Sequence, residues 1–208
     1  MIKLDIVIPV YNEDENIVRL LKALEDEIVC NFRVLICYDS ETDTTLKYIK
    51  DNKIIKSEVL LIRNPRKGPN SAIIKGIDSS NAKIILVYMA DDFENIKLIN
   101  RMTNLIELGN DLVIPTRFMP GGKMIGAAKI KEFVTRIGSY LIYYLARIPF
   151  KDCTNAFKMF SSCISLLYFR CLNHRDTIPF FGANTIEINA MTDSTITTHG
   201  PVGMFGAI

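Results

Sequence analysis

The chain has 208 residues, 49% of them hydrophobic and 23% charged, which is enough for a sizeable core and excludes an intrinsically disordered protein. A net charge of only +2 argues against a nucleic-acid-binding protein that relies on bulk positive charge. Five scattered cysteines and two histidines indicate neither a zinc site nor a disulfide framework. No secretion signal or bilayer-spanning apolar run is readable, so a cytoplasmic protein is expected.

Strands and helices alternate along the first half of the chain. Five apolar runs are typical of buried strands, at residues 4–9, 33–37, 58–62, 83–90 and 111–115. Pro9 is expected to end the first run, because proline cannot donate a hydrogen bond to a sheet. Helices are expected after Asn12, which would cap the first one with Glu15, before Lys50, and near 71–77. The pattern predicts one α/β domain with a mostly parallel, doubly wound (Rossmann-like) sheet flanked by helices.

The apolar run 83–90 ends abruptly in two carboxylates, Asp91 and Asp92. In open α/β sheets, ligands bind just outside the carboxyl ends of the strands, so these side chains are expected to face a ligand. Adjacent carboxylates repel unless a cation joins them, and Mg²⁺ or Mn²⁺ typically takes one or two carboxylates together with substrate phosphates. A metal site at Asp91 and Asp92 is one interpretation, and a solvated turn after a strand is the other.

The longest helical pattern covers residues 126–148, where large apolar side chains recur at helical spacing. A helix buried in the core is the first interpretation. Tyrosines and cations around an apolar face also suit a helix that lies on a membrane surface. The cations of this segment are Lys129, Lys131, Arg136 and Arg147.

Several motifs follow the predicted strands. Residues 8–17 read Ile-Pro-Val-Tyr-Asn-Glu-Asp-Glu-Asn-Ile, and residues 38–43 read Tyr-Asp-Ser-Glu-Thr-Asp. Met-Ala-Asp lies at 89–91 and Asp-Cys-Thr-Asn-Ala-Phe-Lys at 152–158. Together they resemble the inverting GT-A glycosyltransferases, the family that includes dolichyl-phosphate mannose synthase and bacterial polyprenyl-phosphate sugar synthases. The resemblance runs from about residue 4 to about 190 of a single GT-A-like domain, 1–208, and the tail 191–208 matches nothing in the family.

The resemblance implies a site for the nucleotide of a sugar donor. Residues that match Pro9, Tyr11 and Glu13 line the base and ribose in the family, and Asp39 is the expected nucleoside contact. The basic loop 63–68 would bring cations and glycine backbone to the phosphates. The first acid of the family's D-D-G-S-T-D loop is replaced here by Tyr38, and Asp43 is expected to act as a cap or turn residue. The implied nucleotide-binding residues are Pro9, Tyr11, Glu13, Asp39, Lys67 and Gly68.

The resemblance also implies a metal and two phosphate-binding cations. Asp91 matches the second acid of the family's D-x-D motif, whose first acid is absent here, and Asp92 or Glu94 would supply the missing oxygen for Mg²⁺ or Mn²⁺. Arg117 and Lys131 match cations that neutralise the diphosphate or the acceptor phosphate, so the expected catalytic set is Asp91, Arg117 and Lys131. Asp152 and Glu187 are candidates for the acceptor site, with structural roles as the alternative, and Glu187 is expected on a helix.

The activity implied is inverting transfer of a sugar from a UDP- or GDP-sugar to a polyprenyl or dolichyl phosphate, as in dolichyl-phosphate mannosyltransferases. Such an acceptor oxygen is already anionic, so no general base is required. The alternatives are a saccharide or cell-surface glycan acceptor, or a catalytically weak nucleotide-sugar-binding relative. A lipid-linked acceptor implies peripheral contact with the cytoplasmic face of a membrane, and no nucleic acid is expected. A dinucleotide-dependent oxidoreductase is disfavoured, because no G-x-G-x-x-G follows the first strand.

Overall fold

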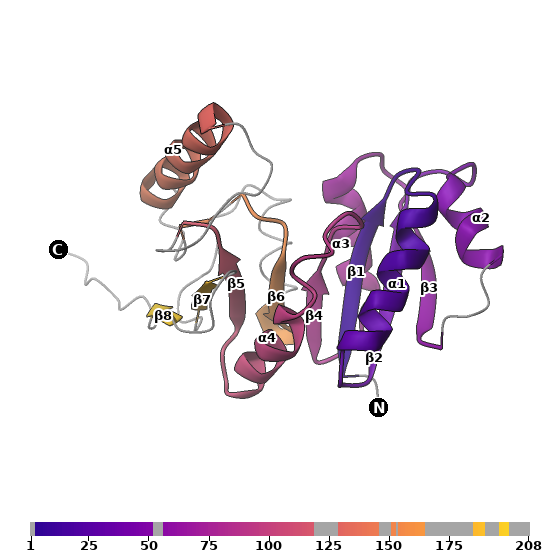
Figure 1. The fold of residues 1–208 in the computed structure, drawn as a ribbon, viewed down its shortest axis with the longest axis horizontal. Helices are drawn as coiled ribbons and strands as arrows, with labels where there is room; N and C mark the ends of the chain where they lie inside the picture. The colour runs from indigo at the N-terminus through magenta and orange to yellow at the C-terminus, as the bar shows by residue number, and fades with distance from the viewer. Residues whose placement is uncertain are drawn as a thin grey trace.

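The computed structural model describes residues 3–51, 56–118, 129–145, 151–152, 154–164, 185–189 and 196–199. Within these residues the strands form one sheet in the order β3-β2-β1-β4-β6-β5-β7-β8, with helices packed on it (Figure 1). The strands are β1 Leu4–Val10, β2 Phe32–Tyr38, β3 Glu58–Arg63, β4 Ile84–Val87, β5 Leu112–Thr116, β6 Lys158–Ser161, β7 Thr185–Asn189 and β8 Ile196–His199. The helices are α1 Glu15–Glu27, α2 Thr44–Asp51, α3 Pro69–Ser79, α4 Leu98–Glu107 and α5 Lys129–Leu145.

The first four strands, β3, β2, β1 and β4, pair in parallel, as the alternating pattern predicts. Every residue of β1 is buried, because β1 lies between β2 and β4 and has helices over both of its faces. One core layer joins the sheet to α1 and α4, through side chains such as Leu20 and Met102. The other joins it to α3, through Ala72 and Ile77. The predicted mostly parallel α/β sheet flanked by helices is therefore confirmed.

Pro9 lies within β1 and does not end it, contrary to the expectation from its missing N–H. It is the register partner of Cys37 in β2. The carbonyl of Val7 accepts a hydrogen bond from Tyr88 N at 3.0 Å, so Val7 faces β4. Pro9, two residues on, faces the same side, where β4 has already ended at Val87. The strand continues through the proline because no ladder bond is lost there.

The second half of the sheet departs from the simple alternating pattern. Strand β6 inserts between β4 and β5 and runs antiparallel to both. Strand β7 runs parallel to β5, and β8 then pairs antiparallel with β7. Glu187 lies on β7, so its expected place on a helix is wrong. Helix α4 was not expected either, although Ile99, Met102 and Ile106 are spaced as the buried face of a helix.

Helix α5 is not the core helix of the first interpretation. Its large apolar side chains are exposed, including Phe133 at 64% and Tyr144 at 70%. The helix stands off the sheet at the same end of the molecule as the loop that follows β1 (Figure 1). Among the described residues, no helix combines the length and the apolar character needed to cross a lipid bilayer.

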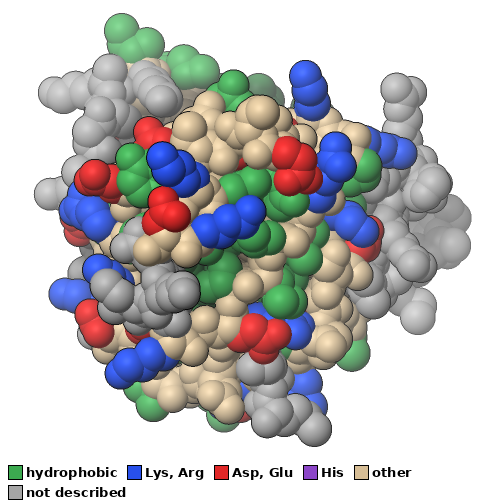
Figure 2. Space-filling view, turned by 90° about the vertical axis from the view of Figure 1, so that its right-hand side faces the viewer, with side chains coloured by type: hydrophobic (Ala, Val, Ile, Leu, Met, Phe, Trp, Pro, Cys, Tyr) green, Lys and Arg blue, Asp and Glu red, His purple; other side chains and the backbone are tan. Residues whose placement is uncertain are grey.

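Strand β3 is one of the two outermost strands of the described sheet. Figure 2 looks onto the side of the molecule where α2 and β3 lie, and shows hydrophobic side chains in the middle with acidic and basic ones around them. Leu61 of β3 contributes to the exposed apolar surface of the chain. Charges of both signs are interspersed on this face, so it carries no extended field of one sign.

Gly76 marks the closest approach of α3 to the sheet. A Cβ atom at this position would lie 2.4 Å from Val7 Cγ1 and 2.6 Å from Cys37 Sγ. Both contacts are far shorter than van der Waals distances, so any larger residue must push α3 away from β1 and β2. The absence of a side chain at position 76 therefore allows the packing of this layer.

We predict that Gly76→Ala lowers the free energy of unfolding by about 1–3 kcal/mol, because overpacking outweighs the better helix propensity of alanine. Gly138→Ala is the matched control in α5, where no atom of the described part of the chain lies within 4 Å of the added methyl group. That change should be neutral or slightly stabilising. Urea denaturation followed by circular dichroism measures both, and equal stabilities for the two variants would contradict the packing argument.

Candidate active site

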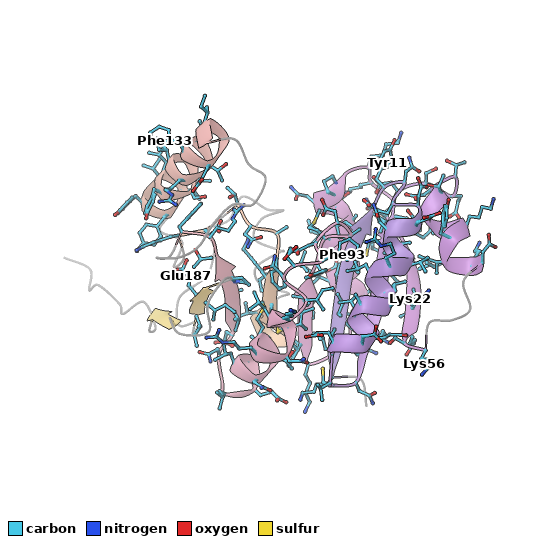
Figure 3. The ribbon with its side chains drawn as sticks, in the orientation of Figure 1. Tyr11, Lys22, Lys56, Phe93, Phe133 and Glu187 are labelled. Atoms are coloured by element: carbon cyan, nitrogen blue, oxygen red, sulfur yellow. The ribbon has the colours of Figure 1, made fainter. Side chains whose placement is uncertain are left out.

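The site lies where the parallel strands end. Tyr11 directly follows β1, Asp39 directly follows β2, and Asp91 lies a few residues beyond β4. These strands are parallel and in close register, with Val10 opposite Tyr38. All three side chains therefore lie at the same edge of the sheet, the one formed by the carboxyl ends of its parallel strands. The Tyr11 side chain is 74% exposed and projects beyond the end of β1 (Figure 3). The structure thus brings together three of the residues that the sequence singled out.

The loop between β1 and α1 is fastened to the start of α2. Asn12 Oδ1 accepts a hydrogen bond from Thr44 N at 3.2 Å, and Asn12 N donates to Asp43 Oδ1 at 3.1 Å. Glu13 N donates to Thr45 Oγ1 at 3.0 Å. Asn12 adopts a positive φ of 54°, which asparagine tolerates better than most residues. Three hydrogen bonds therefore fasten the two residues that follow Tyr11 to the start of α2.

The capping roles differ from those expected for this loop. Asn12 does not cap α1, whose N-cap is Asp14 without a side-chain cap bond. Its side chain instead serves the first turn of α2. Asp43 acts as the predicted cap residue, since its Oδ1 accepts from Thr45 N at 2.9 Å. The other oxygen of Asp43 is buried and has no hydrogen-bond partner among the residues that the structure describes.

Negative charge gathers beside this loop. The pKa of Glu13 is raised, first by burial and then by the nearby charges of Asp91, Asp43 and Asp14. The repulsion among these carboxylates favours either a proton or a bound cation. In the described part of the chain, however, no group of three or more His, Cys, Asp or Glu side chains could hold a metal ion on its own.

The two adjacent carboxylates after β4 have different surroundings. Asp91 is exposed. Asp92 turns toward Asn95, which donates from its backbone N at 3.1 Å and from Nδ2 at 2.7 Å. The hydroxyl of Tyr88 donates to the carbonyl of Asp92 at 2.8 Å. Asp92 therefore closes the turn after β4, and Asp91 is the carboxylate that faces outward.

Asp39 joins β2 to the basic loop between β3 and α3. Its Oδ1 accepts from Asn64 Nδ2 at 2.7 Å, and its Oδ2 accepts from Gly68 N at 2.8 Å. Gly68 adopts a φ of +109°, a conformation that residues with a side chain rarely adopt. The backbone turn at Gly68 is the part of the loop that was expected to approach the nucleotide. Lys67 in the same loop is exposed. Asn64 was not assigned a role from the sequence, although an Asn-Pro pair after a strand marks a turn.

Arg117 follows β5 and is held by Asp152. Its Nε and Nη2 donate to the two carboxylate oxygens at 2.8 and 2.6 Å, and its backbone N donates to Oδ2 at 3.0 Å. Asp152 is fully buried, and its hydrogen bonds raise the pKa of Arg117. The Arg117 side chain keeps 24% of its surface exposed. Arg117 is thus a fixed cation at the edge of the site, and Asp152 is its anchor.

Glu187 has similar surroundings to Asp152. It is buried on β7 and accepts a hydrogen bond from Lys151 N at 2.7 Å, next to Asp152 in the chain. Figure 3 shows Glu187 well below the level of Tyr11 and α5. Asp152 and Glu187, the two candidates for the acceptor site, therefore make contacts of the kind expected if their roles are structural. The side chain of Lys131 lies outside the described residues.

An aromatic joint connects α5 to the end of β5. The Phe118 ring stacks on the Tyr140 ring with centroids 6.4 Å apart, and the guanidinium of Arg136 lies 5.4 Å from the Phe118 centroid. Arg136 also pairs with Glu132 at 3.3 Å. These contacts place α5 beside Arg117, with the apolar face of the helix turned away from the sheet. Among the other cations of this segment, the side chains of Lys129 and Lys131, and Arg147 as a whole, lie outside the described residues.

Solved structures share this fold. Glucosyl-3-phosphoglycerate synthase from Mycobacterium tuberculosis, solved with Mn²⁺, UDP and phosphoglyceric acid, superposes with a TM-score of 0.59 over 95% of this chain and 71% of its own, at 12% identity. TarS of S. aureus superposes with a TM-score of 0.53 over 78% of this chain and 48% of its own, at 18% identity. At such identities the likeness concerns the fold alone, which is the GT-A type.

Sequence relatives extend the comparison. Dolichol-phosphate mannosyltransferase of Pyrococcus furiosus is 26% identical over 151 residues, which are 72% of this chain and 43% of that protein. Undecaprenyl-phosphate 4-deoxy-4-formamido-L-arabinose transferase of Proteus mirabilis is 28% identical over 120 residues, 53% of this chain and 36% of that protein. The chain thus spans less than half the length of these two relatives. The pattern of Glycosyl transferase family 2 matches residues 5–165, most of the chain, and the protein therefore belongs to this family of glycosyltransferases.

Proposed function

We propose that the protein transfers a sugar from a UDP- or GDP-sugar to a polyprenyl or dolichyl phosphate, with inversion at the anomeric carbon. The observation that carries the proposal is the grouping of Tyr11, Asp39 and Asp91 at one edge of the sheet in a family 2 chain. The names of the two sequence relatives above support a polyprenyl-phosphate acceptor. A dolichyl-phosphate mannosyltransferase-like activity is one form that this transfer can take.

The donor nucleotide would bind along the loops after β1, β2 and β3. The exposed ring of Tyr11 offers a surface on which a base can stack. Asp39 would accept a hydrogen bond from the nucleoside. Pro9 and Glu13 would lie next to the ribose. Lys67, exposed in the loop that Asp39 anchors, and the backbone of Gly68 would meet the phosphates.

A divalent cation, Mg²⁺ or Mn²⁺, would bind between Asp91 and the donor diphosphate. The chemistry of the donor set fits, because an exposed carboxylate beside other acids attracts a hard cation, which completes its shell with phosphate oxygens. Asp92 would be a secondary ligand, since its carboxylate is engaged by Asn95. When bound, the cation would offset the charge on the leaving diphosphate.

The remaining residues favour a phosphate acceptor. Arg117, fixed by Asp152, would bind phosphate by charge-assisted hydrogen bonds, with Lys131 as a second cation. A hydroxyl acceptor needs a general base within hydrogen-bond reach. The carboxylates of Asp152 and Glu187 are buried and already accept hydrogen bonds from Arg117 and Lys151. An acceptor that arrives as an anion needs no such base.

The exposed face of α5 supports peripheral contact with the cytoplasmic face of a membrane. Its apolar side chains recur at helical spacing on one side of the helix. The helix lies beside Arg117 through the Phe118–Tyr140 contact. A lipid-linked acceptor phosphate at the membrane surface would then lie near the cation proposed to bind it.

The activity is tested by a screen of UDP- and GDP-sugars, with and without Mn²⁺. The acceptors are a short polyprenyl phosphate, the corresponding polyprenol, and a saccharide. We expect sugar transfer to the polyprenyl phosphate alone and only with the metal, measured by chromatography of the radiolabelled product. Transfer to the saccharide would support the glycan alternative, and nucleotide binding without transfer would support the catalytically weak alternative.

Asp91→Ala is expected to abolish the metal dependence of nucleotide binding. Calorimetry with UDP and GDP should show tighter binding by the wild-type protein when Mn²⁺ is present, and no such gain for the variant. Asp78→Ala, which removes an exposed acid from α3, is the control and should behave like the wild type. An unchanged metal effect in Asp91→Ala would mean that this acid belongs only to a solvated turn.

Membrane contact is tested by co-sedimentation with anionic phospholipid vesicles. Replacing Phe133, Leu141 and Tyr144 by Ser should reduce vesicle affinity at least about tenfold, because each large apolar side chain removed from water contributes about 1.5–3 kcal/mol. The control replaces Val29 and Leu108, two exposed apolar residues near the opposite edge of the sheet, by Ser. Wild-type protein that stays in the supernatant at low salt would refute the membrane contact.

A further inference from the structure

We propose that Asn64 is a positioning residue that determines which nucleobase the site accepts, by keeping the Asp39 carboxylate a fixed acceptor. The inference rests on the proposed function, in which Asp39 contacts the nucleoside. It concerns a residue that touches Asp39 and the basic loop and is itself buried, with 3% of its surface exposed.

Every polar group of the Asn64 side chain has a partner. Nδ2 donates one hydrogen to Asp39 Oδ1 at 2.7 Å and the other to Ser71 Oγ at 2.8 Å. Oδ1 accepts from Arg66 N at 3.2 Å. The backbone N of Asn64 also donates to the carbonyl of Tyr38, the residue before Asp39, at 2.8 Å. The amide can therefore adopt only one orientation, with its donor side toward the carboxylate.

Asp39 is consequently held by two donors, one on each oxygen. Gly68 N donates to Oδ2 at 2.8 Å, opposite the bond from Asn64 to Oδ1. The two bonds fix the plane of the carboxylate, and the lone pairs that remain can only accept. A ligand group next to this carboxylate can form a hydrogen bond with it only if that group is a donor.

The place of Asp39 beside Tyr11 makes this property selective. The two residues follow register partners, Val10 and Tyr38, on adjacent strands. A base that stacks on Tyr11 would turn its hydrogen-bonding edge toward Asp39. Uracil carries an N–H at N3 and guanine carries one at N1, whereas cytosine and adenine have a lone pair at the matching position and donate only from the amino group beside it. A fixed acceptor opposite the ring position pairs with a ring N–H and is repelled by a ring lone pair, so it favours uracil and guanine.

The decisive variant is Asn64→Asp, which keeps the shape of the side chain and replaces its donor by an oxygen. Two carboxyl groups would then face each other across the present 2.7 Å contact, and such pairs share a proton because both cannot ionise. A proton shared in this way removes negative charge from the Asp39 carboxylate and makes it a weaker acceptor for the base. The preference for a base with a ring N–H should then disappear.

The measurement is calorimetry with UDP against CDP and GDP against ADP, in the presence of Mn²⁺. The wild-type protein should bind the preferred member of at least one pair about tenfold or more tightly, the size expected for a hydrogen bond to a charged group. In Asn64→Asp this ratio should fall close to one. The affinity for inorganic pyrophosphate, which has no base, should stay within about twofold of the wild type; an equal loss for all ligands would indicate general damage to the loop and overturn the proposal.

Asn100→Asp is the matched control. Its amide also bridges two segments, accepting from Val29 N and donating to the Glu27 carbonyl, but it lies away from the Asp39 loop. This variant should keep the wild-type ratio. If Asn64→Asp does not fold, Asn64→Ala replaces it and should lower the ratio by loosening one of the two anchors of Asp39.

An unchanged ratio in the folded Asn64 variant overturns the positioning role. A wild-type protein that binds none of the four nucleotides overturns the proposed function itself, and a wild-type protein that binds all four equally overturns only the selective role of Asp39 and Asn64.

Discussion

The parallel pairing of β1 with β2 on one side and β4 on the other is the constraint on which the site depends. Three strands that run in the same direction must end at the same edge, and their following loops must meet there. The burial of β1 by helices on both faces makes any other arrangement of these strands costly, because it would expose a continuous apolar segment. Tyr11, Asp39 and Asp91 lie at the same end of the sheet for this reason.

The loops at this edge are held by polar side chains that cross from one loop to the next. Asn12 and Asp43 join the first loop to the second, and Asp39 and Asn64 join the second to the third. Loops ordered in this way present donors and acceptors in fixed directions before any ligand arrives, which lowers the entropy lost on binding. The side chains of Tyr11, Lys67 and Asp91 are exposed and are not part of these hydrogen bonds. They can therefore contact a ligand without disturbing the bonds that hold the loops together.

The second half of the chain supplies a cation and an apolar surface to the same end of the molecule. The ion pair of Arg117 with the fully buried Asp152 is a strong polar link in this half, since three hydrogen bonds join the two residues. Phe118, the residue after Arg117, stacks on Tyr140 and so connects the end of β5 to α5. An arginine fixed beside an exposed apolar helix suits the proposed acceptor, which has an anionic head and a lipid tail. This half would then complement the half that is proposed to bind the nucleotide.

The sequence by itself determined the parallel half of the sheet and the residues at its edge, because apolar periodicity and the residues that end each strand are local properties. It also pointed to Asp43 as a cap. Only the tertiary structure decided that Asn12 serves α2, that Asp152 anchors Arg117 from 35 residues away, and that β6 inserts between β4 and β5. The exposure of the apolar side chains of α5 was likewise decided only by the tertiary structure. Periodicity defines an apolar face, but what covers that face depends on the packing of distant segments, and hydrogen-bond partners far apart in the chain leave no mark in local sequence.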